Sequence, residues 1–412
     1  MKCSRWGRLC LLAMIPCAAP QAAAAEPQSV PVLRWPEVAA AVDRHPLVAG
    51  AEAARRGAAG AVATARALPD PILSVSMGEA RSRVGGAGGR EWSYTIGLPL
   101  DLLATRGPRV AAAEATEAST RQDAAAARAE ALRELRRAFV ALAHDEAAVE
   151  TTAALEGQAA QLAALVRKRA ERGEARPTEV PRVEMELERL RGALDRARAA
   201  AEGARQRLTA AVGRPVGRVE ADLSLAPSLP ALDALRERVL ASSPILQASR
   251  ARVDAAAAGA SAERWERFPK IAIEGTRAEE PDRRTTTFGA TVALPVWSWN
   301  GGRVREADAA VDAERARLDA AARELTARLG EAWQACAAGQ AVVRRFGQEI
   351  LPRAERSAGA LGRAFELGEV GLLDVIDARR TLLDTRREAL DVQLDMQNAC
   401  GDLAALAGLE LP

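Results

Sequence analysis

The chain has 412 residues with 57 basic and 55 acidic side chains, and 3% of its residues are aromatic. This balance gives no sign of a nucleic acid partner, which requires a strongly basic surface. With only two histidines and no apolar run of about 18 residues, a metal enzyme and a membrane-crossing helix are not expected.

Residues 1–25 have the features of a secretory signal peptide. The segment begins with the basic residues Lys2, Arg5 and Arg8 and continues with a short apolar stretch at 9–15. An alanine-rich cleavage site follows at 23–25. Without these three bases the chain has 54 bases against 55 acids, so its net charge is near −1. Lipidation at Cys17 is disfavoured because residues 14–16 are not the small residues that a lipoprotein signal needs.

The mature chain is expected to begin with an extended lead and two helices. The sequence predicts a short helix over 35–44 and a longer one over 46–68 that begins at Pro46. His45 precedes this proline and is interpreted as a helix cap or surface residue rather than a metal ligand. His144, in the middle of a later helix, is not expected to bind metal either.

Two stretches, 71–101 and 269–297, have a period of two, and each predicts a β-hairpin with strands of about ten residues. Apolar residues alternate with small or polar ones, and the latter are expected to face a water-filled lumen: Ser74, Ser76 and Glu274. A charge that faces lipid near the bilayer centre costs about 2–4 kcal/mol, though less for glutamate. The pattern therefore favours a membrane β-barrel over a hairpin packed on a soluble core.

Aromatic residues are rare in this chain, yet several are placed at or within the predicted strands. Those expected to form an interfacial girdle are Trp92, Tyr94, Trp265, Phe268, Trp297 and Trp299. Four strands cannot close a barrel, and lipid forbids an open sheet because unpaired backbone groups are costly there. Three copies of the chain would supply twelve strands.

Four long helices are predicted, over 109–171, 178–212, 302–366 and 373–407. They are rich in alanine, arginine and glutamate, and a helix of sixty residues spans about 90 Å. Paired antiparallel helices in coiled-coil contact are expected.

The turn between the last two helices has a second copy 195 residues earlier, so that Gly368-Glu369 corresponds to Gly173-Glu174. The chain is therefore interpreted as an internal repeat of one structural unit. The first repeat is expected at 26–213, a linker at 214–230 and the second repeat at 231–412.

Two cysteines, Cys336 and Cys400, remain after the signal peptide, and each is 32 residues from Gly368. Because the two cysteines are equally far from the turn, they are expected at the same height of an antiparallel helical hairpin. An oxidising compartment allows a disulfide, but packed helix axes lie about 8–10 Å apart, which opposes it. Two small buried cysteines are the commoner arrangement, and the bond is left open.

No catalytic constellation is found, and no cofactor is expected. The glycine turn followed by residues 374–383 (D-V-I-D-A-R-R-T-L-L), together with the signal and the repeat, resembles the outer-membrane efflux (TolC-like) family. Finer motifs resemble its cobalt–zinc–cadmium resistance subgroup: Pro69-Asp70-Pro71, residues 98–102, residues 300–302 and residues 349–352. The loop at 103–108 departs from the usual glycine-rich form. Drugs, solvents or a secreted polypeptide stay open as cargo, and a soluble periplasmic adaptor is a less favoured alternative.

The resemblance implies a mainly helical homotrimer, with a twelve-stranded β-barrel in the bacterial outer membrane and a helical barrel in the periplasm. It implies that an adaptor protein and an inner-membrane pump of the RND type are partners. Docking tips would be formed by Gly173, Glu174, Gly368, Glu369, Val370 and Gly371. A periplasmic gate would be lined by Glu179, Phe365, Asp374 and Asp377. Thr178 or Asp374 could instead act as a helix N-cap, with Glu179 in a first turn. Val370 occupies a place where some relatives have a gating arginine.

Overall fold

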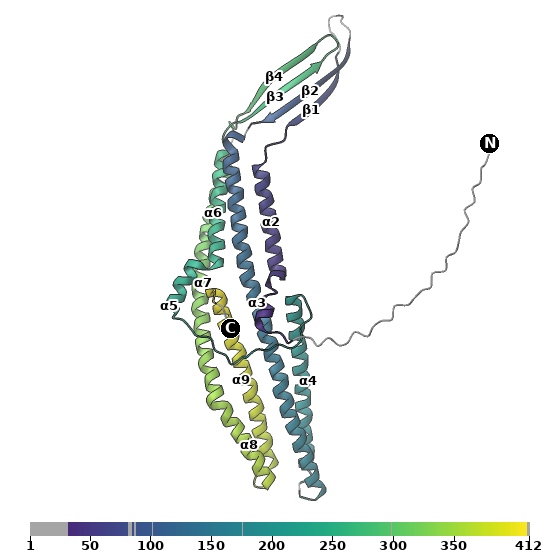
Figure 1. Cartoon of the computed structure of the whole chain (residues 1–412), viewed down its shortest axis with the longest axis vertical. Helices are drawn as coiled ribbons and strands as arrows, with labels where there is room; N and C mark the ends of the chain where they lie inside the picture. The colour runs from purple at the N-terminus through teal and green to yellow at the C-terminus, as the bar shows by residue number, and fades with distance from the viewer. Residues whose placement is uncertain are drawn as a thin grey trace, which may run out of the picture.

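The computed structural model describes residues 32–80, 85, 88–100, 102–174, 176–297 and 299–409. The expected signal peptide and Cys17 lie outside these residues. The described chain is long and narrow, with a sheet at one end and the turns of two helical hairpins at the other (Figure 1).

The bounds of the helices are Trp35–Ala39 (α1), the 3₁₀ turn Val42–Arg44 (η1), Pro46–Arg66 (α2), Leu102–Glu171 (α3), Glu179–Val212 (α4), Leu232–Ser242 (α5), Pro244–Trp265 (α6), Gly301–Arg345 (α7), the π turn Phe346–Ile350 (η2), Leu351–Leu367 (α8) and Leu372–Ala407 (α9). The bounds of the strands are Ile72–Ala80 (β1), Gly89–Pro99 (β2), Lys270–Glu279 (β3) and Arg284–Ala293 (β4). Both predicted β-hairpins are confirmed.

The four strands form one antiparallel sheet in the order β1-β2-β3-β4. The central pair β2–β3 joins the two hairpins, with Thr95 opposite Thr276. Strands β1 and β4 are the edges of this sheet, so each has one side without a strand partner among the described residues. An edge of this kind offers a row of unpaired N–H and C=O groups to another strand.

One face of the sheet is apolar and exposed. The register places Leu73 opposite Ile96 and Leu98 opposite Ile273, and the side chains of all four are exposed. The same face continues over Val75, Met77, Trp92, Tyr94, Ile271, Phe288 and Val292. An apolar patch that spans four strands marks a surface that is covered in the working molecule, by a partner or by lipid.

The helix α3 begins earlier than the sequence predicts. It has 70 residues and includes Pro108 in its second turn, whereas a start at Arg109 was expected. Proline lacks the N–H that would bond to the carbonyl four positions earlier, so Pro108, which lies beyond the first turn, removes one hydrogen bond of this helix. At 1.5 Å per residue, α3 spans about 105 Å.

The predicted continuous helix over 302–366 is interrupted. The helix α7 ends at Arg345 and passes through the π turn η2 into α8, with Pro352 in the first turn of α8. Pro352 cannot donate a backbone hydrogen bond, and the wider turn before it accommodates this missing donor.

Three apolar clusters form the core. The first packs α3 and α4 against the N-terminal segment and the linker, around Leu135 and Leu208. The second lies near the hairpin turns and joins both helical hairpins, with Val166 and Val183 from one and Phe365 and Val375 from the other. The third packs α5, α6, α7 and α9 around Leu329.

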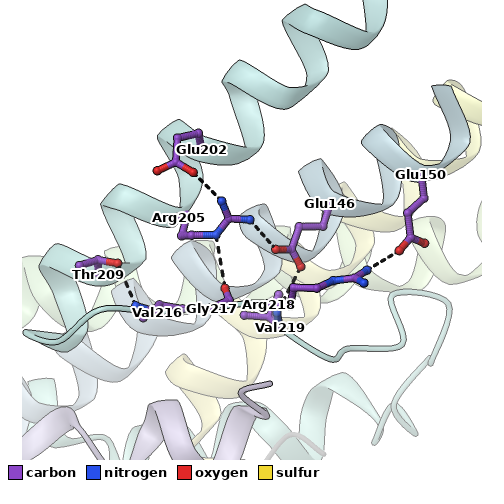
Figure 2. Close-up of polar contacts among 9 residues, drawn as sticks. All are labelled: Glu146, Glu150, Glu202, Arg205, Thr209, Val216, Gly217, Arg218 and Val219. Atoms are coloured by element: carbon purple, nitrogen blue, oxygen red, sulfur yellow. Dashed lines mark hydrogen bonds and ion pairs between the residues drawn. The ribbon is translucent and has the colours of Figure 1, made fainter. Parts of the chain in front are cut away.

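The linker at 214–230 is fixed to the first hairpin by a polar network (Figure 2). The carboxylate of Glu146, on α3, is 9% exposed and accepts hydrogen bonds from Arg205 Nη2 at 2.9 Å and the Val219 N–H at 3.2 Å. The hydrogen bond to Glu146 raises the pKa of Arg205. Arg205 also reaches the Gly217 carbonyl, and Arg218 pairs with Glu150. The middle of the molecule is therefore tied together across both helices of this hairpin.

A disulfide joins Cys336 of α7 to Cys400 of α9 and decides the question that the sequence left open. Their Cα atoms are 4.8 Å apart, and both residues are buried. The helices can come this close because Gly339 packs on Met396, where an added Cβ would lie 3.0 Å from the Met396 side chain. The equal numbers of residues from Gly368 thus gave the correct heights. Because each Cα lies about 2.3 Å from its helix axis, this Cα distance fits facing helices whose axes are about 8–10 Å apart.

Candidate functional site

The two hairpin turns have the same backbone geometry. Gly173 has φ of 76° and Gly368 has φ of 81°, a left-handed conformation that favours glycine. The next N–H in each turn closes back on the helix, from Glu174 to Arg169 O at 2.8 Å and from Glu369 to Ala364 O at 2.9 Å. These bonds complete a Schellman motif at the end of α3 and of α8.

The acidic residues after each turn lie in the first turn of a helix. Glu179 is the first residue of α4, after Thr178 as N-cap, and the Thr178 side chain makes no capping hydrogen bond. The N-cap of α9 is Gly371 and not Asp374, because Asp374 is the third residue of the helix. Its Oδ2 accepts the Gly371 N–H at 3.0 Å. Both carboxylates therefore complement a helix dipole, while Asp377 is exposed one turn later.

Phe365 differs from the expectation that it lines an opening. It is 6% exposed and packs in the cluster that joins the two hairpins. The guanidinium of Arg169 stacks over its ring at 5.0 Å. Arg169 also donates to the carbonyls of Phe365 at 3.1 Å and Glu366 at 2.7 Å, so this ring and this cation close the gap between α3 and α8.

Two further arginines bridge the hairpins at a greater distance from the turns. Arg380 of α9 pairs with Glu186 of α4, and this hydrogen bond raises the pKa of Arg380. Arg379 donates to the Gln158 carbonyl of α3 at 2.8 Å. The sequence predicts no bridging role for Arg169, Arg379 or Arg380.

The expected lumen residues share the face of the sheet opposite the apolar one. Ser76 bonds to Ser93 at 2.8 Å, and Ser74 lies opposite Thr95. Glu274 accepts a hydrogen bond from Thr291 at 3.2 Å. This face is polar across all four strands.

The aromatic residues gather mainly where the sheet meets the helices. Trp265 and Phe268 stack with ring centroids 5.0 Å apart just before β3, and Trp297 and Trp299 are exposed just after β4. Trp92 lies at the other end of the apolar face, opposite Glu279, and Tyr94 lies between the ends. Aromatic side chains thus border the apolar band on both sides.

Both histidines lie in the described part of the chain, and neither belongs to a metal cluster there. Among the described residues no group of three histidine, cysteine, aspartate or glutamate side chains could hold a metal ion. His45 caps α2 and accepts the Leu47 N–H at 3.4 Å, as expected for a cap. No helix in the described part of the chain is long and apolar enough to cross a membrane.

Comparison with solved structures supports this fold. The chain superposes on CusC with a TM-score of 0.78 at 16% identity, covering 92% of this chain and 93% of that one. It superposes on the open state of the Neisseria gonorrhoeae outer membrane channel MtrE with a TM-score of 0.77 at 18% identity, covering 91% and 89%. These likenesses concern the arrangement of the helices and strands.

Comparison of sequences identifies the family. The chain is 28% identical over 342 residues to the cobalt-zinc-cadmium resistance protein CzcC of Cupriavidus metallidurans, covering 81% of this chain and 79% of the relative. The profile of the outer membrane efflux protein family matches residues 38–214 and again 235–409. The chain therefore belongs to the outer membrane efflux protein family and is a channel, not an enzyme.

Proposed function

We propose that three copies of this chain form an exit channel that carries cations across the outer membrane. This proposal rests on the four-stranded sheet, which has one apolar face, one polar face and two edges without a strand partner among the described residues. Edge β4 of one copy would pair with edge β1 of the next, which would give twelve strands in a closed barrel. The apolar face would meet lipid, and the polar face would line the lumen.

The chain is further proposed to be an internal duplication. Two observations support this: the family profile matches twice, and the turns at Gly173 and Gly368 have the same hydrogen bonds. The boundaries would be those expected from the sequence, with repeats at 26–213 and 231–412 that follow a signal peptide at 1–25. The matched stretches would give each hairpin of the sheet its own pair of long helices.

The far end of the helices is proposed to be a gate held closed by contacts between the hairpins. Glu179, Asp374 and Asp377 lie near the turns, where carboxylates from three copies would converge on the axis. Such a ring attracts cations and repels anions. Phe365 is not included as a lining residue because it is buried between the hairpins.

The hairpin turns are proposed to dock a periplasmic adaptor that connects the channel to an inner-membrane pump of the RND type. The turns between α3 and α4 and between α8 and α9 lie furthest from the sheet (Figure 1). These turns contain Gly173, Glu174 and the segment 368–371. Substituting Gly368 would strain its left-handed backbone, so Glu369→Arg is the cleaner test. We expect this variant to lose export and to keep the trimer and its place in the membrane.

Heavy-metal cations are the proposed cargo, because a relative that covers four-fifths of this chain is named for cobalt, zinc and cadmium resistance. The experiment expresses the chain with a matching adaptor and pump in a cell that lacks its own channel. We expect a heat-resistant trimer in the outer membrane fraction and increased tolerance of these cations. A trimeric channel that leaves metal tolerance unchanged would refute the cargo, and a soluble monomer would refute the channel.

A further inference from the structure

Glu274 lies in the middle of the polar face of the sheet, between two glycines. Its cross-strand partner on β2 is Gly97 and its partner on β4 is Gly289. Neither has a side chain that could cover the carboxylate, and an added Cβ at Gly97 would lie 3.6 Å from Glu274 Cγ. Among the described residues the one side-chain hydrogen bond of Glu274 comes from Thr291 Oγ1 at 3.2 Å, and this hydroxyl group is an uncharged donor.

The other groups on this face do not neutralise that charge. The neighbouring hydroxyl groups bond to one another, as Thr95 does to Thr276 at 2.9 Å. No lysine or arginine of the described residues forms an ion pair with Glu274. The register puts the three arginines of the strands on the opposite face: Arg90, Arg277 and Arg284. Lys270, on the polar face at the helix end of β3, is paired with Glu266 at 2.9 Å.

We propose that Glu274 is a specificity-determining residue that makes the barrel interior prefer cations. This inference rests on the proposed trimeric channel, in which three such carboxylates would surround the lumen at one height. An uncompensated carboxylate in a confined aqueous path raises the local concentration of cations and lowers that of anions. The preference is separate from any at the hairpin turns, because the intervening helix α3 spans about 105 Å.

Conductance alone would not isolate the effect of Glu274, because a narrow gate at the hairpin turns would dominate the conductance. The local potential is measured instead with a cysteine at Thr287, which faces Thr276 and is a diagonal neighbour of Glu274 at about 7–8 Å. The rate constants of a cationic and an anionic methanethiosulfonate reagent, added from outside to cells or proteoliposomes, give a ratio that reports the potential. Cys336 and Cys400 do not interfere, because they are buried and bonded to each other.

The Thr287→Cys protein is compared with Thr287→Cys/Glu274→Gln. Replacing the carboxylate by an amide should lower the ratio of cationic to anionic rate constants by about twofold at 0.15 M salt and by about fourfold at 0.01 M salt. The larger effect at low salt follows from the longer screening length. A ratio that is unchanged by Glu274→Gln at both salt concentrations would overturn the inference.

A control separates this inference from the proposed channel itself. Phe288→Cys, one residue further on β4, lies on the apolar face and should not react with either charged reagent in the membrane. If Phe288→Cys reacts and Thr287→Cys does not, the polar face does not line the lumen, and the proposed barrel fails. If only Thr287→Cys reacts and its ratio of rate constants is the same with Glu274→Gln, the proposed barrel is supported and the proposed role of Glu274 is wrong.

Discussion

The second helical hairpin is held together differently at its middle and near its turn. At its middle, α7 and α9 are joined by the Cys336–Cys400 disulfide and by the close contact of Gly339 with Met396. Near its turn, it is held to the first hairpin by Arg169, Arg380 and an apolar cluster. The π turn Phe346–Ile350 lies between these two regions.

This difference separates a fixed part from a part that can move. A covalent bond keeps the two helices of the second hairpin in one register near the middle. Hydrogen bonds, ion pairs and apolar contacts between the hairpins can break and form again without unfolding. We therefore expect changes at the middle to alter stability, and changes near the turns to alter the opening.

The largest effect is expected from removing the disulfide. The bond closes a loop with a sequence separation of 64 residues, and the chain-entropy account assigns such a loop about 4 kcal/mol of stability. Replacing Cys336 and Cys400 by alanine should lower the denaturant concentration at the unfolding midpoint while the conductance stays the same. Thiol titration of the denatured, unreduced protein without residues 1–25 is the control, and two free thiols per chain would show that the bond does not form.

The next largest effect is expected at Arg169. Arg169→Ala removes two charge-assisted hydrogen bonds to the carbonyls at the end of α8 and the contact with Phe365, a loss of about 2–3 kcal/mol. The hairpins should separate more readily, so single-channel conductance in planar bilayers should rise. Arg172→Ala, in the exposed turn, is the matched control and should leave the conductance as it is. Equal conductance in all three proteins would mean that Arg169 does not hold the gate.

A smaller effect is expected for the ion pair of Glu186 with Arg380. Glu186 is buried but half of the Arg380 side chain is exposed, so the pair is partly screened and its coupling energy should be about 1 kcal/mol. A double-mutant cycle with Glu186→Gln and Arg380→Gln measures it from the unfolding free energies. Additive effects of the two substitutions would show that the pair contributes no net coupling.

The smallest effect is expected at His144, which bridges α3 and α9. Its ring nitrogens contact Asp145 at 2.9 Å and Asp391 at 3.0 Å, and the hydrogen bond to Asp145 is the main reason that its pKa is raised above 6.5. A raised pKa means that the stabilisation is complete below about pH 6.5 and is lost as the pH rises through the folded value.

We expect this site to contribute less than about 1 kcal/mol. The unfolding free energy of the wild type minus that of His144→Gln should decrease between about pH 6 and 8. Asp391→Asn should remove part of the same pH dependence. A difference that is constant over this range would contradict the assignment.

Much of the fold could be predicted from the sequence because its signals are periodic. The alternation around Leu73 and Ile273 has a period of two that only a strand satisfies, and the structure has strands there. The glycines at 173 and 368 mark reversals because few other residues accept a left-handed backbone. The count from Gly368 to each cysteine also placed the two sulfur atoms at the same height.

The contacts across the hairpins could not be predicted in the same way. Arg169 and Arg379 bond to backbone carbonyls, which every residue has, so their partners leave no mark in the sequence. Burial of Phe365 depends on the packing of α3 against α8, which no local pattern encodes. The π turn before Pro352 accommodates the backbone N–H that proline lacks, and no periodic pattern in the sequence indicates it.

A barrel made by three copies requires edge β4 of one copy to pair with edge β1 of the next. Within one chain these edges are three strand spacings apart, about 14 Å, so a cross-linker with two maleimide groups and a spacer of about 8 Å cannot join them. The measurement treats Ser74→Cys/Gly289→Cys protein in outer membranes with this reagent, and Thr95→Cys/Thr276→Cys serves as the control for neighbouring strands of one chain. We expect covalent trimers from the first pair of cysteines and monomers from the second pair. Monomers alone from the first pair, in protein whose cysteines have both reacted, would contradict a barrel closed by three copies.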